Sequence, residues 1–248
     1  MLAIYVLWLR QLKRYVRSRS RIIGSLGQPI LFLVALGFGL GPVFRRAGNG
    51  NYIDFLAPGV IAQGILFTAI FSGIELVWDR QFGFLKETLV APVSRMSIMI
   101  GRTLGGATIA TMQGMVVFLL TLVIGFRPYS LAHLPLFIVL MFLISLFFTA
   151  VGTTIASLLE DFQGFQLIMN FLVMPLFFLS GALFPLSGLS PVLTLITQIN
   201  PLAYGVDGLR GALIHSSHFG IGLDIAVLAG LSVIMLTVGS YFFSRIEV

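Results

Sequence analysis

The chain has 248 residues, of which 58% are hydrophobic and only 10% charged, and its mean hydropathy is +1.03. Soluble domains carry about 25% charged residues, so the composition excludes a soluble protein and predicts an all-α integral membrane protein. The net charge of +6 does not indicate nucleic-acid binding, because Lys and Arg flank the hydrophobic runs, as membrane topology and anionic lipid favour. The absence of cysteine excludes disulfides and thiolate metal sites.

Residues 1–21 predict an amphipathic helix lying on the membrane surface. Apolar residues, including Trp8, recur at helical spacing on one side. The other side carries basic residues, namely Arg10, Lys13, Arg14 and Arg17. The segment is not a secretory signal, because its basic cluster follows the apolar stretch and no small-residue cleavage site ends it. Anchoring on anionic lipid alone and an added contact with a partner both fit this pattern.

Six hydrophobic runs are long enough to cross the membrane, which takes about 20 helical residues. The predicted spans are residues 22–44, 55–78, 98–125, 134–158, 165–184 and 221–243. The chain 1–248 then forms one transmembrane domain with both termini on the same side. Most Lys and Arg residues lie on that side, although Arg45 and Arg46 do not. The positive-inside rule therefore places both termini in the cytoplasm.

Residues 79–95, between the second and third predicted spans, predict a short cytoplasmic amphipathic helix. Phe82, Leu85 and Leu89 fall on one face. The charged residues of the segment lie largely off that face, and they include Asp79, Arg80 and Lys86. A helix of this kind between two spans is suited to hold a cytoplasmic partner.

Three residues define the expected ends and the packing of this helix. Asp79 is expected at its start, where a carboxylate complements the helix dipole. Pro92 ends it, because proline cannot continue an α-helix. Gly83 would cost about 1 kcal/mol in the helix interior, so its presence predicts a close approach by another surface.

The predicted spans contain a few uncharged polar residues and several pairs of small ones. Gln63, Gln113 and Asn170 could form interhelical hydrogen bonds or could contact a transported substrate. Gly101 and Gly105 are four residues apart, a spacing that lets helices approach closely.

Residues 185–220 predict two short re-entrant or interfacial helices on the outer side, because the apolar runs are too short to span. The chain breaks between them at Asn200 and Pro201. Asp207 and Arg210 would share a face of the second helix and could pair. We interpret them as structural, since charges within membranes are retained where they are partnered.

The motifs of an enzyme are missing from the sequence. No G-x-x-x-x-G-K-[ST] motif occurs, so the chain does not bind ATP by that route. No serine is accompanied by a base within a span. His215 and His218 are spaced to share a metal, but no acidic residue accompanies them. We therefore predict neither a catalytic nor a metal site.

Three stretches in order resemble the membrane subunits of type-2 ATP-binding-cassette (ABC-2 type) exporters. They are residues 79–95 (DRQFG followed by LVAPVSR), 175–185 (PLFFLSGALFP) and 200–210 (NPLAYGVDGLR). The first looks like the family's cytoplasmic acid-Arg-acid-x-Gly element, but Asp79 and Gln81 stand where the family more often has glutamates. That departure puts strict charge pairing at these positions in doubt.

The resemblance implies a machine in a bacterial-type inner membrane with two copies of this chain and two of a separate ATPase. The ATPase would bind ATP and Mg, and this chain would hold no cofactor. Residues 1–21 would be a connecting helix and 79–95 the coupling helix. The coupling residues would be Asp79, Arg80, Gln81, Phe82, Gly83, Leu85, Lys86 and Leu89. The first and fifth spans of the two copies would form the seam.

The resemblance also implies export of drugs, glycolipids or polysaccharides, and the apolar interior favours an amphipathic or lipid-linked cargo. Two other functions compete with it. An ion-coupled secondary transporter would need ionisable residues at the midplane and repeated halves, and neither is apparent. A non-transporting assembly protein would use residues 79–95 only to recruit a partner.

Overall fold

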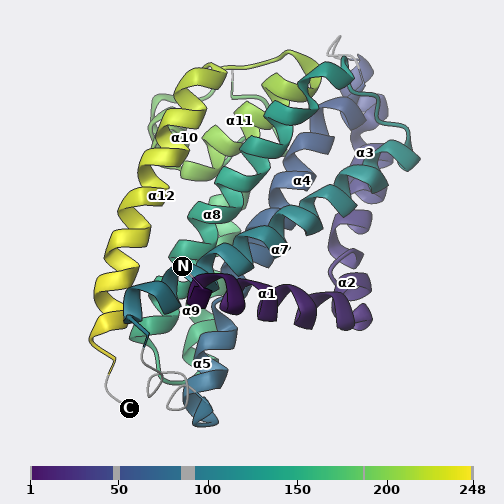
Figure 1. The fold of residues 1–248 in the computed structure, drawn as a ribbon. Coiled ribbons are helices and arrows are strands. Elements are labelled where there is room, and N and C mark those ends of the chain that lie inside the picture. The colour runs from purple at the N-terminus through teal and green to yellow at the C-terminus, as the bar shows by residue number, and fades with distance from the viewer. Residues whose placement is uncertain (1, 47–50, 85–92, 187, 247–248) are drawn as a thin grey trace.

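The computed structural model describes residues 2–46, 51–84, 93–186 and 188–246. Within these ranges the chain is helical and contains no β-strand, which confirms the predicted all-α class. The helices are α1 (Leu2–Arg17), α2 (Arg19–Gly24), α3 (Gly27–Arg46), α4 (Tyr52–Phe71), α5 (Ile74–Gln81), α7 (Arg95–Ile124), the 3-10 turn η1 (Leu131–His133), α8 (Leu134–Leu158), α9 (Phe162–Phe178), α10 (Pro191–Ile199), α11 (Pro201–Ile214) and α12 (Ile221–Ser244). Figure 1 shows α10 and α11 at one end of the bundle, opposite to α5 and the carboxyl terminus.

Five helical stretches of the described chain are long and apolar enough to cross a membrane, and each coincides with a predicted span. They are Ile22–Phe44, Tyr52–Gln81, Arg95–Ile124, Leu131–Leu158 and Ile221–Ser244. The remaining prediction, 165–184, corresponds to α9, which has 17 residues. At about 1.5 Å per residue α9 is about 25 Å long, shorter than the roughly 30 Å hydrocarbon layer.

The boundaries of α9 differ from the prediction because local capping decides them. The side chain of Asp161 accepts a hydrogen bond from the amide of Gly164 and so starts the helix before residue 165. The helix ends at Phe178, and the chain turns at Gly181, where φ is 75°. A positive φ favours glycine, so the predicted continuation to residue 184 is wrong.

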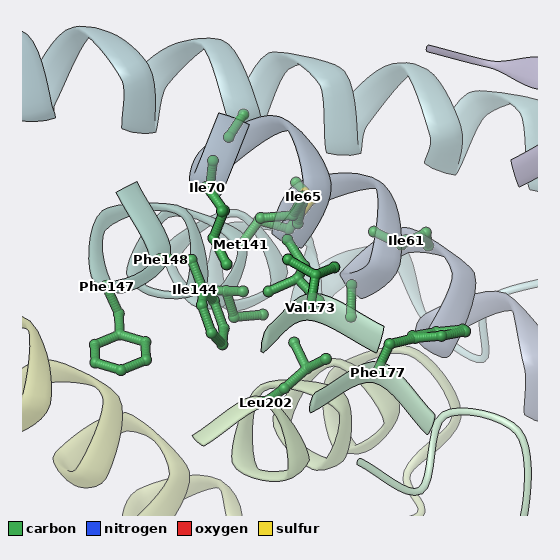
Figure 2. Close-up of a cluster of buried hydrophobic side chains, with 14 of the residues drawn as sticks. Ile61, Ile65, Ile70, Met141, Ile144, Phe147, Phe148, Val173, Phe177 and Leu202 are labelled. Carbon is green, nitrogen blue, oxygen red and sulfur yellow. The ribbon is translucent and has the colours of Figure 1, made fainter. Parts of the chain in front are cut away.

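Helix α4 lies at the centre of the molecule. It is buried along most of its length and packs against α3, α7, α8, α9 and α11. Figure 2 shows part of this core, to which α4 contributes Ile61, Ile65 and Ile70, α8 contributes Met141, Ile144, Phe147 and Phe148, α9 contributes Val173 and Phe177, and α11 contributes Leu202. Because lipid is as apolar as these side chains, close van der Waals packing holds the helices together here.

The second span is interrupted between α4 and α5. Ser72 and Gly73 separate the two helices, and Gly73 lies against the backbone of Gly152 on α8. A Cβ on Gly73 would overlap the carbonyl oxygen of Gly152, and a Cβ on Gly152 would overlap that of Ile70. This approach of two backbones holds α5 against α8.

The amino-terminal helix ends at Arg17, before the predicted residue 21, and it lies on α7 (Figure 1). Its backbone at Ile4 and the side chain of Gln11 pass over Gly101 and Gly105 of α7. The close approach predicted from this glycine pair therefore occurs, and α1 is the helix that uses it.

Candidate functional site

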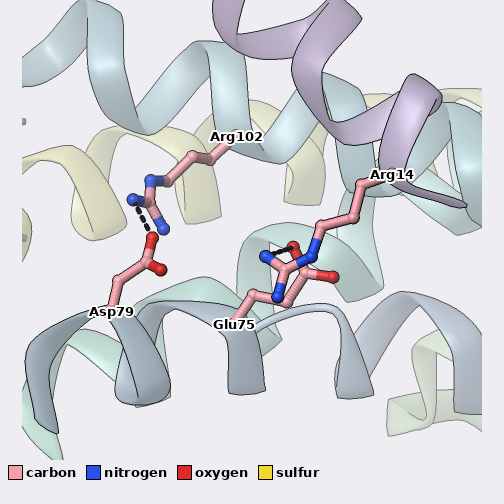
Figure 3. A network of polar contacts seen from close by, with 4 residues as sticks. All are labelled: Arg14, Glu75, Asp79 and Arg102. Carbon is pink, nitrogen blue, oxygen red and sulfur yellow. Dashed lines mark hydrogen bonds and ion pairs between the residues drawn. The ribbon is translucent and has the colours of Figure 1, made fainter. Parts of the chain in front are cut away.

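Two buried acidic residues hold α5 to its neighbours (Figure 3). The carboxylate of Asp79 lies 2.5 Å from a guanidinium nitrogen of Arg102 on α7, and both side chains are at most 10% exposed. Glu75, one turn earlier on α5, lies 3.7 Å from Arg14 of α1. The two pairs therefore join α5 to α7 and to α1. Removing either charge of the buried pair would leave the other uncompensated.

Asp79 does not start a helix, and this part of the prediction is wrong. It lies in the last turn of α5, the continuation of the second span. A carboxylate is unfavourable at that end of a helix, where the dipole is negative. The ion pair with Arg102 compensates for this position, and it turns the Asp79 side chain toward α7, away from the surface.

Arg80 joins the end of α5 to the connection between α8 and α9. Its guanidinium donates to the carboxylate of Glu160 at 2.7 Å and to the carbonyl oxygen of Leu159 at 3.5 Å. Trp78 stacks on Phe162 at the start of α9, with ring centroids 5.9 Å apart. Because Glu160 is largely exposed, water weakens this ion pair, and the stacked rings add apolar contact.

The end of α5 presents aromatic side chains at the surface. Gln81 is exposed, Phe82 is 70% exposed and Phe84 is 53% exposed. Gly83 lies between the two phenylalanines with a φ of 78°, and a Cβ there would meet nothing within 4 Å. Gly83 is therefore not in a helix interior, and the left-handed backbone that follows α5 explains the glycine. Leu85, Lys86, Leu89 and Pro92 lie outside the described residues.

One side of α1 packs against α7, and the other side is exposed. Trp8 donates a hydrogen bond to the hydroxyl of Thr108 on α7 at 3.0 Å, so it is held by protein contacts. A groove along the exposed side of α1 is lined by Val6, Leu9, Arg10, Lys13, Arg14 and Arg17. These basic residues are exposed, and Arg14 also pairs with Glu75 in the first turn of α5.

The structure brings together two of the three polar residues predicted within spans. Gln63 of α4 and Gln113 of α7 are buried and line the same pocket between α1, α3, α4 and α7. Asn170 is exposed on α9 and does not line that pocket. Gln113 accepts a hydrogen bond from the hydroxyl of Tyr15 at 2.6 Å, so it does take part in interhelical bonding.

Asp207 and Arg210 are buried at the opposite end of the bundle, where each has partners other than its neighbour on α11. Asp207 accepts from the backbone amides of His218 and Phe219 at 2.7 and 2.8 Å. Arg210 donates to the carbonyl oxygens of Phe55 and Gly181. Among the described residues the two form no direct ion pair, so the pairing that their spacing allows is not observed.

The short outer helices themselves are observed as α10 and α11. Pro201 occupies the first turn of α11. The side chain of Asn200 caps this helix by accepting from the amide of Leu202, and it donates to the carbonyl oxygen of Leu176 on α9. The break predicted at Asn200 and Pro201 therefore also ties the outer helices to α9.

The histidines do not gather around a metal site. In the described ranges no group of three or more His, Cys, Asp or Glu residues could hold a metal ion. The ring of His215 packs against His133 and Tyr129, with centroids 4.7 and 4.5 Å away. The backbone amide of His218 binds Asp207. The spacing of His215 and His218 thus reflects the turn before α12.

The sequence did not single out three charged residues with defined positions in the structure. Arg102 neutralises Asp79, although in the sequence it is only one of the charges that flank a predicted span. Glu160 receives Arg80. Asp224, in the first turn of α12, is completely buried, and neither of its carboxylate oxygens has a hydrogen-bond partner in the described structure. Only the first two carried a signal, namely opposite charges at the same predicted side of the membrane.

Comparison with known proteins places the chain among transporters. The family profile described as ABC-2 type transporter matches residues 2–214. The chain is 33% identical over 202 residues to the transport permease ycf38 of Porphyra purpurea, which covers 78% of this chain and 68% of the relative. It is 27% identical over 226 residues to Nodulation protein J of Sinorhizobium fredii, covering 89% and 85%, and 27% over 219 residues to Nodulation protein J of Rhizobium meliloti, covering 87% and 82%.

Proposed function

The chain belongs to the ABC-2 type transporter family, and from this premise we propose that it is the transmembrane subunit of an ATP-driven exporter. A separate ATPase subunit supplies the energy, with ATP and Mg bound by that partner and no catalytic residue in this chain. The observation that carries this assignment is the end of α5, where exposed Phe82 and Phe84 follow a helix fixed by two ion pairs, of which the Asp79–Arg102 pair is buried.

The ATPase docks on residues 79–95 in this proposal. Exposed aromatic side chains can fill an apolar groove on a partner, a common mode of helix recognition. Arg10, Lys13 and Arg17 on the exposed side of α1 give the same end of the bundle a positive surface, which can orient an acidic partner and bind anionic lipid.

The ion pairs carry movement of the docked segment into the spans. Displacing the end of α5 disturbs the pairs of Asp79 with Arg102 and of Glu75 with Arg14, so α7 and α1 move with it. Arg80 extends the connection to the start of α9 through Glu160. Asp79 and Arg80 thus act as positioning residues, and the ATPase contacts Phe82 and the residues that follow.

Two copies of the chain form the transporter, and α3 and α9 face the second copy. Phe32 of α3 contacts Phe177 of α9, so these helices lie together. On α9 the amides of Gln163, Gln166 and Asn170 fall three and four residues apart and are all exposed. Amides facing hydrocarbon would lack partners, whereas a second copy or a polar path beside it would satisfy them.

In this arrangement α9 completes six spans, and both termini lie in the cytoplasm of a bacterial-type inner membrane. The turn after Phe178 packs into the bundle, where the carbonyl oxygen of Gly181 receives Arg210. A shorter span can be accommodated by such turns and by local thinning of the bilayer. The cargo is amphipathic, lipid-linked, saccharide or drug-like, and it leaves from the cytoplasm or the inner leaflet.

Co-purification from a native membrane tests the proposal. Gentle detergent extraction of the tagged chain is expected to retain an ATP-binding subunit at equal stoichiometry. The combined variant Phe82→Ala with Leu85→Ala should lose that subunit while remaining monodisperse. Val123→Ala, an equally apolar change at an exposed position on α7, serves as the control. A homo-oligomer without an ATPase after gentle extraction would contradict the proposal.

Asp224 is the one observation that favours an ion-coupled secondary transporter, because its buried carboxylate could bind a proton. Its place in the first turn of α12 is far from the midplane where coupling residues lie. Transport in vesicles distinguishes the two functions. An exporter stops when ATP is withheld and continues when the proton gradient is collapsed, and a proton-coupled transporter behaves in the opposite way.

A further inference from the structure

A pocket of about 250 Å³ lies between α1, the connection from α2 to α3, α4 and α7. Ser25 and Gln28 stand at its partly exposed rim, and Gln63 and Gln113 form its buried end. The pocket extends for about 12 Å along α4, because its lining residues Gln63 and Phe71 are eight residues apart in that helix. The pocket therefore leads from the edge of the bundle to buried amides.

These amides have unused hydrogen-bonding groups. In the described part of the chain neither the nitrogen nor the oxygen of the Gln63 side chain has a partner, and Gln63 is 1% exposed. The amide nitrogen of Gln113 also has none, although its oxygen accepts from Tyr15. Burying an unpaired amide is costly. A ligand that forms hydrogen bonds with both glutamines would offset this cost.

The lining of the pocket selects for an uncharged ligand. Its residues include no Asp, Glu, Lys or Arg, so a charged group would enter without a counter-charge. The amides and hydroxyls can both donate and accept hydrogen bonds, as a hydroxyl group does. Phe67 and Phe71, stacked with centroids 6.2 Å apart, add an apolar wall. The volume lies below the range of about 300–1,000 Å³ for drug-sized ligands, and so suits a single head group.

The rim carries apolar surface at the start of a candidate membrane span. The candidate span Ile22–Phe44 begins beside it, and Ile23 and Ile30 present apolar surface there, 70% and 39% exposed. Gly24, which also lines the pocket, has open space around it. An acyl chain attached to a bound head group can therefore remain in the surrounding lipid.

We propose that this pocket binds the uncharged, hydroxyl-bearing head group of a lipid, with hydrogen bonds to the amides of Gln63 and Gln113. The same chemistry occurs in a lipid-linked cargo and in a resident membrane lipid. As an identification of cargo this inference rests on the proposed export function, whereas the binding site itself does not.

Lipid binding in nanodiscs tests the site. The purified chain is placed in phosphatidylcholine containing monoglucosyl-diacylglycerol or phosphatidylglycerol, and native mass spectrometry measures the lipid that stays bound. We expect retention of the glucosyl lipid and not of the anionic one. Gln63→Leu should reduce this retention about tenfold, since it removes both unpaired groups. Gln198→Leu, an exposed amide on α10, should leave it unchanged.

A structural role for the amide would give a different pattern. Gln63→Leu removes a buried polar group without a partner, so its thermal midpoint should be unchanged or raised. Equal retention of both lipids, or retention that survives Gln63→Leu, overturns the inference. If that variant does not fold, Gln28→Leu at the rim decides in its place, because Gln28 is partly exposed.

Measurements with the ATPase partner distinguish a lipid-linked cargo from a resident membrane lipid. They also distinguish this inference from the proposed export function. Stimulation of ATP hydrolysis by the glucosyl lipid, with release on ATP addition, identifies a cargo site, and retention without stimulation identifies a resident lipid. Both results support the binding site. If the chain forms the ATPase complex but does not bind the glucosyl lipid, only this inference is refuted. Binding without any ATPase complex refutes only the export function.

Discussion

At the scale of single residues, the charges around α5 show how a membrane protein keeps ionised groups near its core. Asp79 and Arg102 are both buried and pair directly, whereas Arg80 meets the exposed Glu160. A buried pair is expensive to break because one charge remains without water or partner, and an exposed pair costs little. The two pairs should therefore respond very differently to loss of a charge.

We expect Asp79→Asn or Arg102→Gln to destabilise the protein by about 3–5 kcal/mol. The double variant should recover part of this loss, because no unpaired buried charge remains. Glu160→Gln is the control and should cost about 0–1 kcal/mol. Unfolding of each variant in mixed micelles, arranged as a double-mutant cycle, measures the coupling. Equal effects of the buried and exposed changes would contradict the assignment.

At the scale of helices, glycines decide where elements touch. Gly101 and Gly105 let α1 approach α7 closely, and Gly73 and Gly152 let the junction of α4 and α5 approach α8. Other glycines, such as Gly230 on α12, face open space. Small residues at contacts let backbones approach, and so allow the short-range packing that holds helices together in lipid. Glycine content by itself does not reveal which helices meet.

Gly152→Ala should be strongly destabilising, because its Cβ would overlap the carbonyl oxygen of Ile70, a backbone atom that cannot rotate away. Overpacking of this kind costs about 1–3 kcal/mol. Gly230→Ala is the matched control in a helix and should be neutral or stabilise by up to about 1 kcal/mol. Thermal midpoints of the two variants in the same detergent check the difference. A Gly152→Ala protein as stable as the control would show that α8 can shift.

At the scale of the whole molecule, α1 and the end of α12 both lie in the half of the bundle away from α10 and α11 (Figure 1). Arg95, at the start of α7, donates to the carbonyl oxygens of Ser244 and Ile246 near the carboxyl terminus. Arg14 ties α1 to α5 nearby. Figure 1 shows α10 and α11 at the opposite end. An arrangement with both termini on one side requires an even number of crossings, which the proposed sixth span through α9 supplies.

Cysteine labelling tests this topology without background, because the natural chain contains no cysteine. Ser94 and Ser216 are both exposed. Ser94 caps the start of α7, beside the end of α12, and Ser216 follows α11, which lies at the opposite end of the bundle from α5 (Figure 1). In intact cells Ser216→Cys should react with a membrane-impermeant maleimide, and Ser94→Cys should react only after permeabilisation. Labelling of Ser94→Cys from outside would overturn both the orientation and the cytoplasmic position of residues 79–95.

The sequence by itself determined the features that depend on composition and on short spacings. Hydrophobic runs located the five long helices, because a helix must satisfy its own backbone in lipid, and Asn200 with Pro201 located the break between the outer helices. The motifs in order indicated the family, which the comparison with known proteins confirmed. The basic face of α1 was also readable, since it follows from helical period alone.

Only the tertiary structure decided which partners each polar residue takes. Asp79 is predicted at a helix start and instead pairs with Arg102. Asp207, whose spacing allows a pair with Arg210, instead binds the turn before α12. Gln63 and Gln113 lie 50 positions apart in the sequence and meet at one pocket. Such contacts depend on how helices are placed beside one another, and hydrophobic packing, which has little directional preference, leaves no local pattern in the sequence that specifies it.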